Sequence, residues 1–415
     1  MKIKVYIILL FFICGVTAMA VMIKGHQPAE KDRAIMEAVK KQNTPQLIKS
    51  LILRMSQQME KDSESFPELI KEVDNYARQC KDSDAVAVLH SMEAEMYNTY
   101  YENHRIDIAQ RIDLQDFVPD DIREWTSNLF RDKIKSELTA SLQPASLLQR
   151  TWVSKYDLFM NKGADMSELR PTLYDFLVHR AIDIQPDASW YETLLNFRRN
   201  NSNRKALLMA ELDYLSFLHS GRYNDRQTYK TALDSLYAVY GRDPFGAEVK
   251  IAELALLESD NTFNGSDKAG RDSTLALIYK FCKEAIALYP RYSRISVIKN
   301  TLAEMEQAFL DVAVANQNVY PGRDLAIALK YNNVNHVSVR IYKSQRAPAA
   351  AWRNYDRRTP KYCGELVKEL SLNLNLKNTY IQEDTILKVP MDKLGLYEFV
   401  VASDLAYFYQ KGGQY

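Results

Sequence analysis

The hydrophobic positions change their spacing once along the chain, at Tyr320-Pro321-Gly322. Before this point, from Pro28 to Asn318, apolar residues recur at intervals of three and four, which is typical of helices that bury one face. After it, apolar and polar residues alternate, which is typical of strands that bury one face. The pattern predicts a mainly α-helical chain with a C-terminal β-domain, divided into residues 28–318 and 320–415.

The helical region is predicted to be built from pairs of antiparallel helices. Residues 65–104 give a clear pair, with Ser65 and Ser83 as expected N-caps. Another helix is expected to open at Pro119, followed by two acidic residues that suit a helix N-terminus. Further helices fill 204–309, where Pro290 directly after a helix resembles the end of a tetratricopeptide (TPR) unit. We therefore predict a solenoid-like stack of hairpins without a fixed repeat length.

The C-terminal region contains five candidate strands. The first two lie before and after Asn332-Asn333, and in each of them every second residue is apolar. We predict that they fold back on each other as a hairpin with its turn at Asn332-Asn333. The other three are the runs ELSLNLNLKN, TILKVP and LGLYEFVVAS. Short strands at this spacing predict an antiparallel β-sandwich. We expect it to be incomplete, because the tail after Val401 offers no return strand.

The first residues predict export. Lys2 and Lys4 precede an uncharged apolar stretch, and Ala18-Met19-Ala20 fits the cleavage pattern of a secretory signal peptide, residues 1–20. Retention of residues 5–23 as a membrane anchor is the alternative. A lipoprotein with an acylated Cys14 is disfavoured, because Ile13 stands where a small residue is needed. We therefore expect an exported, periplasmic protein that is either anchored in the membrane or free.

Composition and cysteines narrow the function classes. The 54 basic and 53 acidic residues leave a net charge of +1, so the chain lacks the large positive charge that attracts nucleic acid. Without the leader, Cys80, Cys282 and Cys363 remain, an odd and widely spaced set that does not predict a disulfide framework, although one pair stays open. Three thiols with no histidine at ligand spacing do not close a zinc site.

No catalytic, cofactor or metal residues are predicted. The chain lacks HExxH, GxSxG and phosphate-binding GxxxxGK[ST] motifs. His90-x-x-Glu93 places two ligands on one helix face, but two are too few for a catalytic metal, so a structural histidine is preferred. The string Cys363-Gly364-Glu365-Leu366 resembles the thioester CGEQ, yet Leu366 replaces the glutamine whose carbonyl would become the acyl group.

The order of parts resembles the N-terminal portion of bacterial alpha-2-macroglobulin family proteins of the Bacteroides type. In these a helical, repeat-like region precedes the first macroglobulin domain. The likeness rests on Tyr331-Asn332-Asn333-Val334, on Val339-Arg340-Ile341-Tyr342, and on Leu394-Gly395-Leu396-Tyr397-Glu398-Phe399. The resemblance implies a periplasmic or tethered protein that traps proteases. The chain departs from the family by ending at Tyr415, before any bait or thioester region, so we expect a truncated or split protein.

Two functions therefore compete at this stage. The first is a non-catalytic scaffold or binding part of a protease trap, with proteases, envelope proteins or separately encoded macroglobulin domains as partners. The second is an exported helical-repeat adaptor that binds a peptide or an envelope protein. An enzyme with an unrecognised site is a weaker third, because no nucleophile–base pair or metal signature is present. No cofactor is expected.

Overall fold

The structure, a computed structural model, falls into two compact units divided between Tyr223 and Asn224. Several predicted features lie outside the described residues: the leader, the loop with Trp352, Arg357 and Arg358, residue Leu376, and the part of the C-terminal tail beyond residue 403. The coarse prediction is confirmed, because the chain is mainly helical and ends in antiparallel sheets. The described residues are 28–41, 43–61, 65–113, 117–160, 166–220, 226–263, 268–314, 319–345, 363–374 and 380–403.

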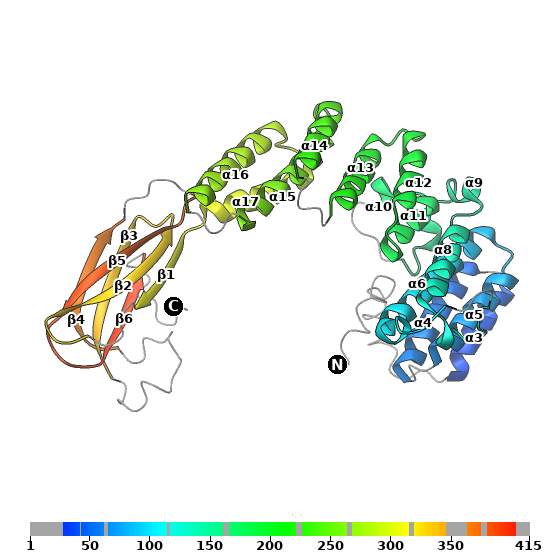
Figure 1. The fold of residues 1–415 in the computed structure, drawn as a ribbon, viewed down its shortest axis with the longest axis horizontal. Coiled ribbons are helices and arrows are strands. Elements are labelled where there is room, and N and C mark those ends of the chain that lie inside the picture. The colour runs from blue at the N-terminus through cyan, green and yellow to red at the C-terminus, as the bar shows by residue number, and fades with distance from the viewer. Residues whose placement is uncertain are drawn as a thin grey trace. The chain divides into compact units, whose positions relative to one another are not determined.

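The long elements of the N-terminal unit are all helices in its described part, which also holds an isolated β-bridge between Trp152 and Thr172 (Figure 1). Most long helices that follow one another along the chain contact each other, as the predicted hairpins require. Its α-helices are α3 Pro28–Lys40, α4 Thr44–Lys61, α5 Phe66–Gln79, α6 Ser83–Asn103, α7 Arg105–Ile108, α8 Ser127–Ser141, α9 Ala145–Leu148, α10 Met166–Leu169, α11 Leu173–Ile184, α12 Ala188–Arg199 and α13 Arg204–His219, with short 3₁₀ turns at Ile122–Glu124 and Val153–Tyr156.

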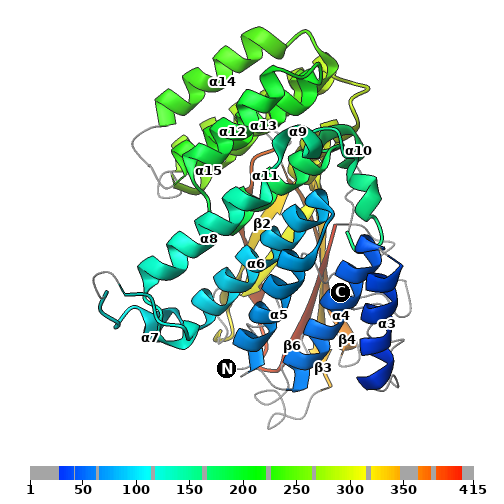
Figure 2. The ribbon, with the colours of Figure 1, turned by 90° about the vertical axis from the view of Figure 1, so that its right-hand side faces the viewer.

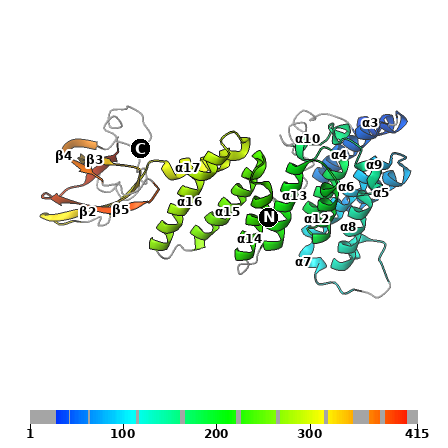
Figure 3. The same ribbon diagram turned by 90° about the horizontal axis from the view of Figure 1, so that it is seen from above.

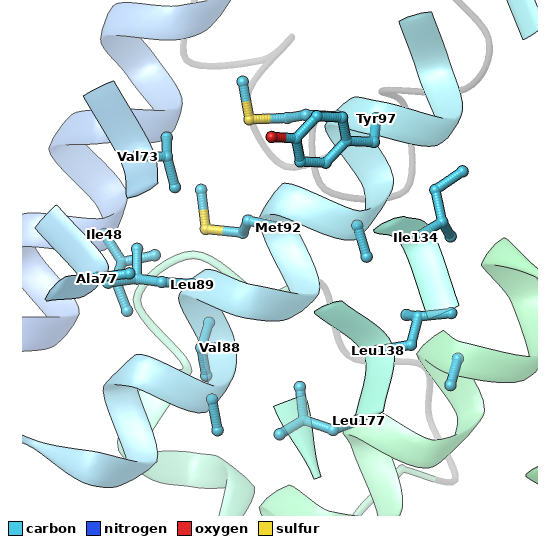
Figure 4. Close-up of a cluster of buried hydrophobic side chains, with 14 of the residues drawn as sticks. Ile48, Val73, Ala77, Val88, Leu89, Met92, Tyr97, Ile134, Leu138 and Leu177 are labelled. Carbon is cyan, nitrogen blue, oxygen red and sulfur yellow. The ribbon is translucent and has the colours of Figure 1, made fainter. Parts of the chain in front are cut away.

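Helix α6 is the centre of this unit. It contacts α5, α8 and α11, and Figure 2 shows α5, α6 and α8 running alongside one another. Figure 4 shows Val88, Leu89 and Met92 of α6 among apolar side chains of the neighbouring helices. Fourteen of its 21 residues are buried, so the helix has neighbours on most of its faces. A helix surrounded in this way needs apolar residues all round rather than one stripe.

Two helix starts differ from the prediction. The N-cap of α6 is Asp82, not Ser83, while Ser65 does occupy the N-cap of α5 but makes no capping hydrogen bond with its side chain. After Pro119 only the 3₁₀ turn Ile122–Glu124 forms, with Asp121 as its N-cap, and α8 begins at Ser127. The hydroxyl of Thr126 accepts a hydrogen bond from the backbone N–H of Leu129 and so caps the helix. A good cap nearer the apolar run outweighed the favourable charge at the proline.

Four long helices open the second unit (Figure 3). They are α14 Arg226–Tyr240, α15 Ala247–Phe263, α16 Lys268–Leu288 and α17 Ser296–Glu306, with 3₁₀ turns at Pro244–Gly246 and Ser293–Ile295. Each contacts the next, and Pro290 follows the end of α16 as predicted. The hydroxyl of Tyr289 donates to the carbonyl of Gly241 at 2.7 Å, which ties the end of α16 to the turn after α14.

Gly246 in this turn has no room for a side chain. A Cβ added there would lie 2.5 Å from the carbonyl oxygen of Tyr240 and 2.8 Å from the Tyr289 hydroxyl. We expect Gly246→Ala to lower the free energy of unfolding of this unit by about 1–3 kcal/mol, because the backbone must move. Denaturant unfolding followed by far-UV circular dichroism measures it. Gly395→Ala is the control, since its nearest atoms are 3.4 Å away; equal effects of the two variants would contradict the packing argument.

Six strands follow the helices and form two three-stranded antiparallel sheets. One sheet has the order β1-β2-β5 and the other β4-β3-β6. Their facing apolar side chains share one core, so the sheets form a sandwich. The strands are β1 Phe309–Val314, β2 Arg323–Asn332, β3 His336–Ser344, β4 Cys363–Asn373, β5 Glu383–Met391 and β6 Tyr397–Ala402.

The predicted hairpin between the first two alternating segments is wrong. Strands β2 and β3 belong to different sheets, so the chain crosses from one sheet to the other at Asn332-Asn333. The predicted faces are nevertheless correct, and both sets of residues are buried in the shared core: Leu325, Ile327, Leu329 and Tyr331 from β2, and Val337, Val339 and Ile341 from β3. Alternation fixes which side chains point inward, and it leaves the hydrogen-bonding partner of the strand open.

The helical prediction up to Asn318 is also wrong for one segment. Phe309–Val314 forms strand β1, which pairs antiparallel with β2 and places Val312 opposite Leu329. Its sequence FLDVAV is apolar at all positions except Asp311, so it lacks the alternation that marked the other strands. An apolar run of this length does not separate a strand from a helix.

Hydrogen bonds connect the helices of the second unit to the sandwich where the chain crosses from β2 to β3. The side-chain amide of Asn332 donates to the carbonyl of Met305 at 3.0 Å. That of Asn333 donates to Met305 and Gln307, at 3.1 and 3.2 Å. These carbonyls lie at the C-terminal end of α17, where backbone acceptors lack helical partners. Asn333 has a φ of 52°, a conformation that asparagine tolerates better than most residues.

Candidate functional site

Helix α6 buries three carboxylates within the N-terminal unit, and two of them have cationic partners. Asp84 accepts hydrogen bonds from Lys155 Nζ at 2.7 Å and from the Tyr156 hydroxyl at 3.1 Å. Glu95 is paired with Arg180 of α11. A buried carboxylate without such partners is costly, so these contacts are expected of a stable core.

Glu93 is the third carboxylate and lacks a comparable partner. It is 1% exposed, and neither of its oxygens makes a hydrogen bond within the described residues. Its neighbours are His90, one turn earlier on α6, and Glu137 on α8. One ligand atom from each of the three residues lies within 4.8 Å of the other two. This group is the strongest candidate site in the described part of the chain.

Glu137 is held in place by two hydrogen bonds. His90 Nδ1 lies 2.6 Å from Glu137 Oε2, and Lys133 Nζ lies 2.6 Å from Glu137 Oε1. His90 is the outermost member, with 27% of its side chain exposed. The site therefore reaches from the core of the helical unit to solvent.

The two carboxyl groups have opposite pKa shifts. Burial, together with the nearby charge of Glu137, raises the pKa of Glu93 to about 8. Burial also pushes the pKa of Glu137 upward, but the hydrogen bonds from His90 and Lys133 outweigh it and hold that pKa below its ordinary value. In the absence of a metal ion, Glu93 is thus the carboxyl group that stays protonated at neutral pH.

The sequence identified two members of the site but not the third. His90 and Glu93 lie on one face of α6, as predicted. Glu137 was missed because it comes from another helix far along the chain, and α8 was expected to begin elsewhere. A local sequence pattern cannot show that tertiary packing brings the Glu137 carboxylate next to His90 and Glu93. The argument that two ligands are too few no longer applies to a group of three.

The other histidines lie outside this group. His104 and His179 each place Nδ1 against the backbone carbonyl one turn earlier in the chain, Tyr100 and Asp175 respectively. Burial lowers the pKa of His179 to about 3, so its ring is neutral. His336 Nε2 lies 2.6 Å from Ser371 Oγ across β3 and β4, and no carboxylate among the described residues orients this ring.

The cysteines and the CGEL string bring no further site. Cys363-Gly364-Glu365-Leu366 lies at the start of β4, and Leu366 is 45% exposed. No disulfide joins Cys80, Cys282 and Cys363, the cysteines of the described residues. Burial raises the pKa of the Cys282 thiol to about 11, which makes it a poor nucleophile. Within the described helices, none has the length and apolarity needed to cross a membrane.

Comparisons with protein-family models, with curated proteins and with solved structures gave no match.

Proposed function

We propose that this chain is a non-catalytic scaffold, the N-terminal helical and first macroglobulin-like part of an exported alpha-2-macroglobulin-like protein. The family role implied is protease trapping in the periplasm, and α14–α17 correspond to its TPR-like hairpins. The observation that carries the proposal is the junction at Asn332-Asn333, where a motif of the resemblance binds the end of α17. A scaffold needs such a fixed connection between its helical and β parts.

The sandwich offers surfaces that suit a further β-domain. Strands β4 and β5 are outermost in their sheets within the described residues. They expose Leu366, Val367 and Ile386 at 45%, 53% and 61%. Exposed apolar side chains on outer strands favour association with another chain or domain. In this proposal the partner is a macroglobulin-type domain.

A binding experiment tests this partner. The tagged chain is mixed with purified macroglobulin-type domains from the same genome, and complex formation is measured by calorimetry. We expect Ile386→Lys to weaken binding at least about 10-fold, because an unpaired charge buried in an interface costs several kcal/mol. Leu277→Lys, on an apolar residue of α16 that is also about half exposed, is the matched control. Absence of binding by the unaltered chain, or equal binding by both variants, would count against the proposal.

A second experiment separates a scaffold from a complete trap. The whole chain is added in molar excess to trypsin-like and elastase-like proteases, and digestion is followed with a large protein and with a small peptide substrate. We expect both rates to stay unchanged, because a scaffold does not enclose the protease. Loss of digestion of the large substrate alone would show that the chain traps proteases by itself.

The adaptor alternative is less well supported. A cavity in the helical unit has a volume of about 30 Å³ and is lined by Met55, Phe66, Met92 and Met96 with their neighbours. That volume holds roughly one or two water molecules. A peptide would therefore need a different surface of the helical unit.

A further inference from the structure

Glu93 makes no ion pair or hydrogen bond within the described residues, and the geometry around it points to an ion that would provide a partner. We propose that His90, Glu93 and Glu137 bind a divalent transition-metal ion, with Zn²⁺ as the best fit. The ion would join α6 to α8 inside the helical unit. This inference is independent of the proposed scaffold function, since it concerns residues of the N-terminal unit alone.

The observation that carries the proposal is the comparison among the buried acids of one helix. Asp84 has Lys155 and Glu95 has Arg180, each close enough for an ion pair. Glu93 is as buried as these two, and both of its oxygens are unpartnered within the described residues. A buried carboxyl group is paired, coordinates a metal or stays protonated. Two further metal-ligating groups lie next to Glu93, and the lysine of this cluster, Lys133, makes its ion pair with Glu137.

The distances require only small movements on binding. The three ligand atoms lie within 4.8 Å of one another. Ligands about 2.0–2.2 Å from a tetrahedral Zn²⁺ lie roughly 3.3 Å apart. Glu93 would move inward by a side-chain rotation, and the contact of 2.6 Å between His90 and Glu137 would open to admit the ion. The partly exposed ring of His90 leaves a route from solvent and a fourth position for water.

The ligand types favour Zn²⁺ over the hard cations. One imidazole nitrogen and two carboxylates suit a borderline metal, whereas Ca²⁺ and Mg²⁺ prefer oxygen ligands alone. Two carboxylates neutralise the ion in the apolar surroundings of α6. Lys133 does not block the site, because it contacts Glu137 Oε1 and leaves Oε2, the oxygen near His90, for the metal.

The site is structural rather than catalytic in this proposal. Its ligands come from two packed helices, and Ile134 and Leu138 of α8 belong to the buried apolar core around them (Figure 4). A metal here would act as a cross-link whose loss loosens the contact between α6 and α8.

The experiment titrates Zn²⁺ into the whole chain after chelator treatment, by calorimetry. We expect one ion per chain at this site, and Glu93→Gln should weaken its binding at least about 100-fold, since even an altered outer-shell partner costs about 10–100-fold. Glu93→Gln keeps the shape of the side chain, so folding, checked by circular dichroism, should persist. Glu102→Gln, an exposed acid of the same helix, is the control and should bind as the unaltered chain does.

A spectroscopic readout excludes the thiols as ligands. Co²⁺ bound at this site should show d–d absorption without the sulfur-to-metal charge-transfer band that a cysteine ligand gives. Unchanged Zn²⁺ affinity in Glu93→Gln would overturn the proposal. So would the absence of bound Zn²⁺ in the unaltered chain, or a charge-transfer band that accounts for all of the bound Co²⁺.

Discussion

Arg198→Met is expected to lower the free energy of unfolding of the N-terminal unit by about 3–5 kcal/mol, the cost of breaking a buried ion pair on one side. Arg198 of α12 is 1% exposed, and its Nη2 lies 2.6 Å from Oδ1 of the fully buried Asp175. The same carboxyl group forms the capping box of α11 with Thr172. Methionine fills much of the arginine volume but leaves the Asp175 carboxylate without its cation.

The measurement is denaturant unfolding followed by tryptophan fluorescence. Three of the four tryptophans, Trp125, Trp152 and Trp190, lie in this unit. The double variant Arg198→Met with Asp175→Asn should recover much of the loss, since neutral replacement of both partners is often tolerated. Arg78→Ala, at an exposed i, i+4 pair with Asp74, should cost no more than about 0.5 kcal/mol. A single Arg198 variant as stable as this control would contradict the argument.

Glu93→Gln is expected to stabilise the metal-free chain, and increasingly so as the pH rises. The pKa of Glu93 is about 8 in the folded protein and 4.5 ordinarily. A raised pKa gives stability that is complete below about pH 4.5 and is lost as the pH rises through about 8. Glutamine has no charge to lose. At pH 7 the difference reaches on the order of 3 kcal/mol, from 1.36 kcal/mol per pKa unit.

Unfolding at pH 5, pH 7 and pH 8.5 in the presence of a chelator measures this difference. The two proteins should be close in stability at pH 5 and should diverge above it. Glu102→Gln serves again as the control, because an exposed carboxyl group on α6 has little to gain from neutralisation. A stability difference that does not change with pH would show that Glu93 is ionised in the folded chain over the whole range.

The sequence predicted much of the fold because burial leaves a periodic pattern. The alternation from Leu325 to Tyr331 and from Val337 to Ile341 correctly gave the buried faces of β2 and β3. It could not give their partners, because a hairpin and a crossing between sheets bury the same side chains. The amides of Asn332 and Asn333 were interpreted as turn formers, whereas they also bind the end of α17.

The candidate site was only partly predictable for a similar reason. His90 and Glu93 share a helix, so their spacing alone places them together. Glu137 joins them only because α8 packs on α6, a contact that depends on side chains along both helices. The unusual feature, a buried glutamate without a partner, exists only in the folded molecule.

The strand order of the sandwich bears on how the chain is made. Leu325 of β2 pairs with Val389 of β5, and Val339 of β3 pairs with Val401 of β6. The first sheet therefore cannot be completed before Met391 has been synthesised, and the second not before Ala402, whereas the helices pair with neighbours close in sequence. During synthesis the apolar faces of β2 and β3 are therefore made before the strands that complete their sheets, which makes them the segments of the nascent chain most prone to aggregate.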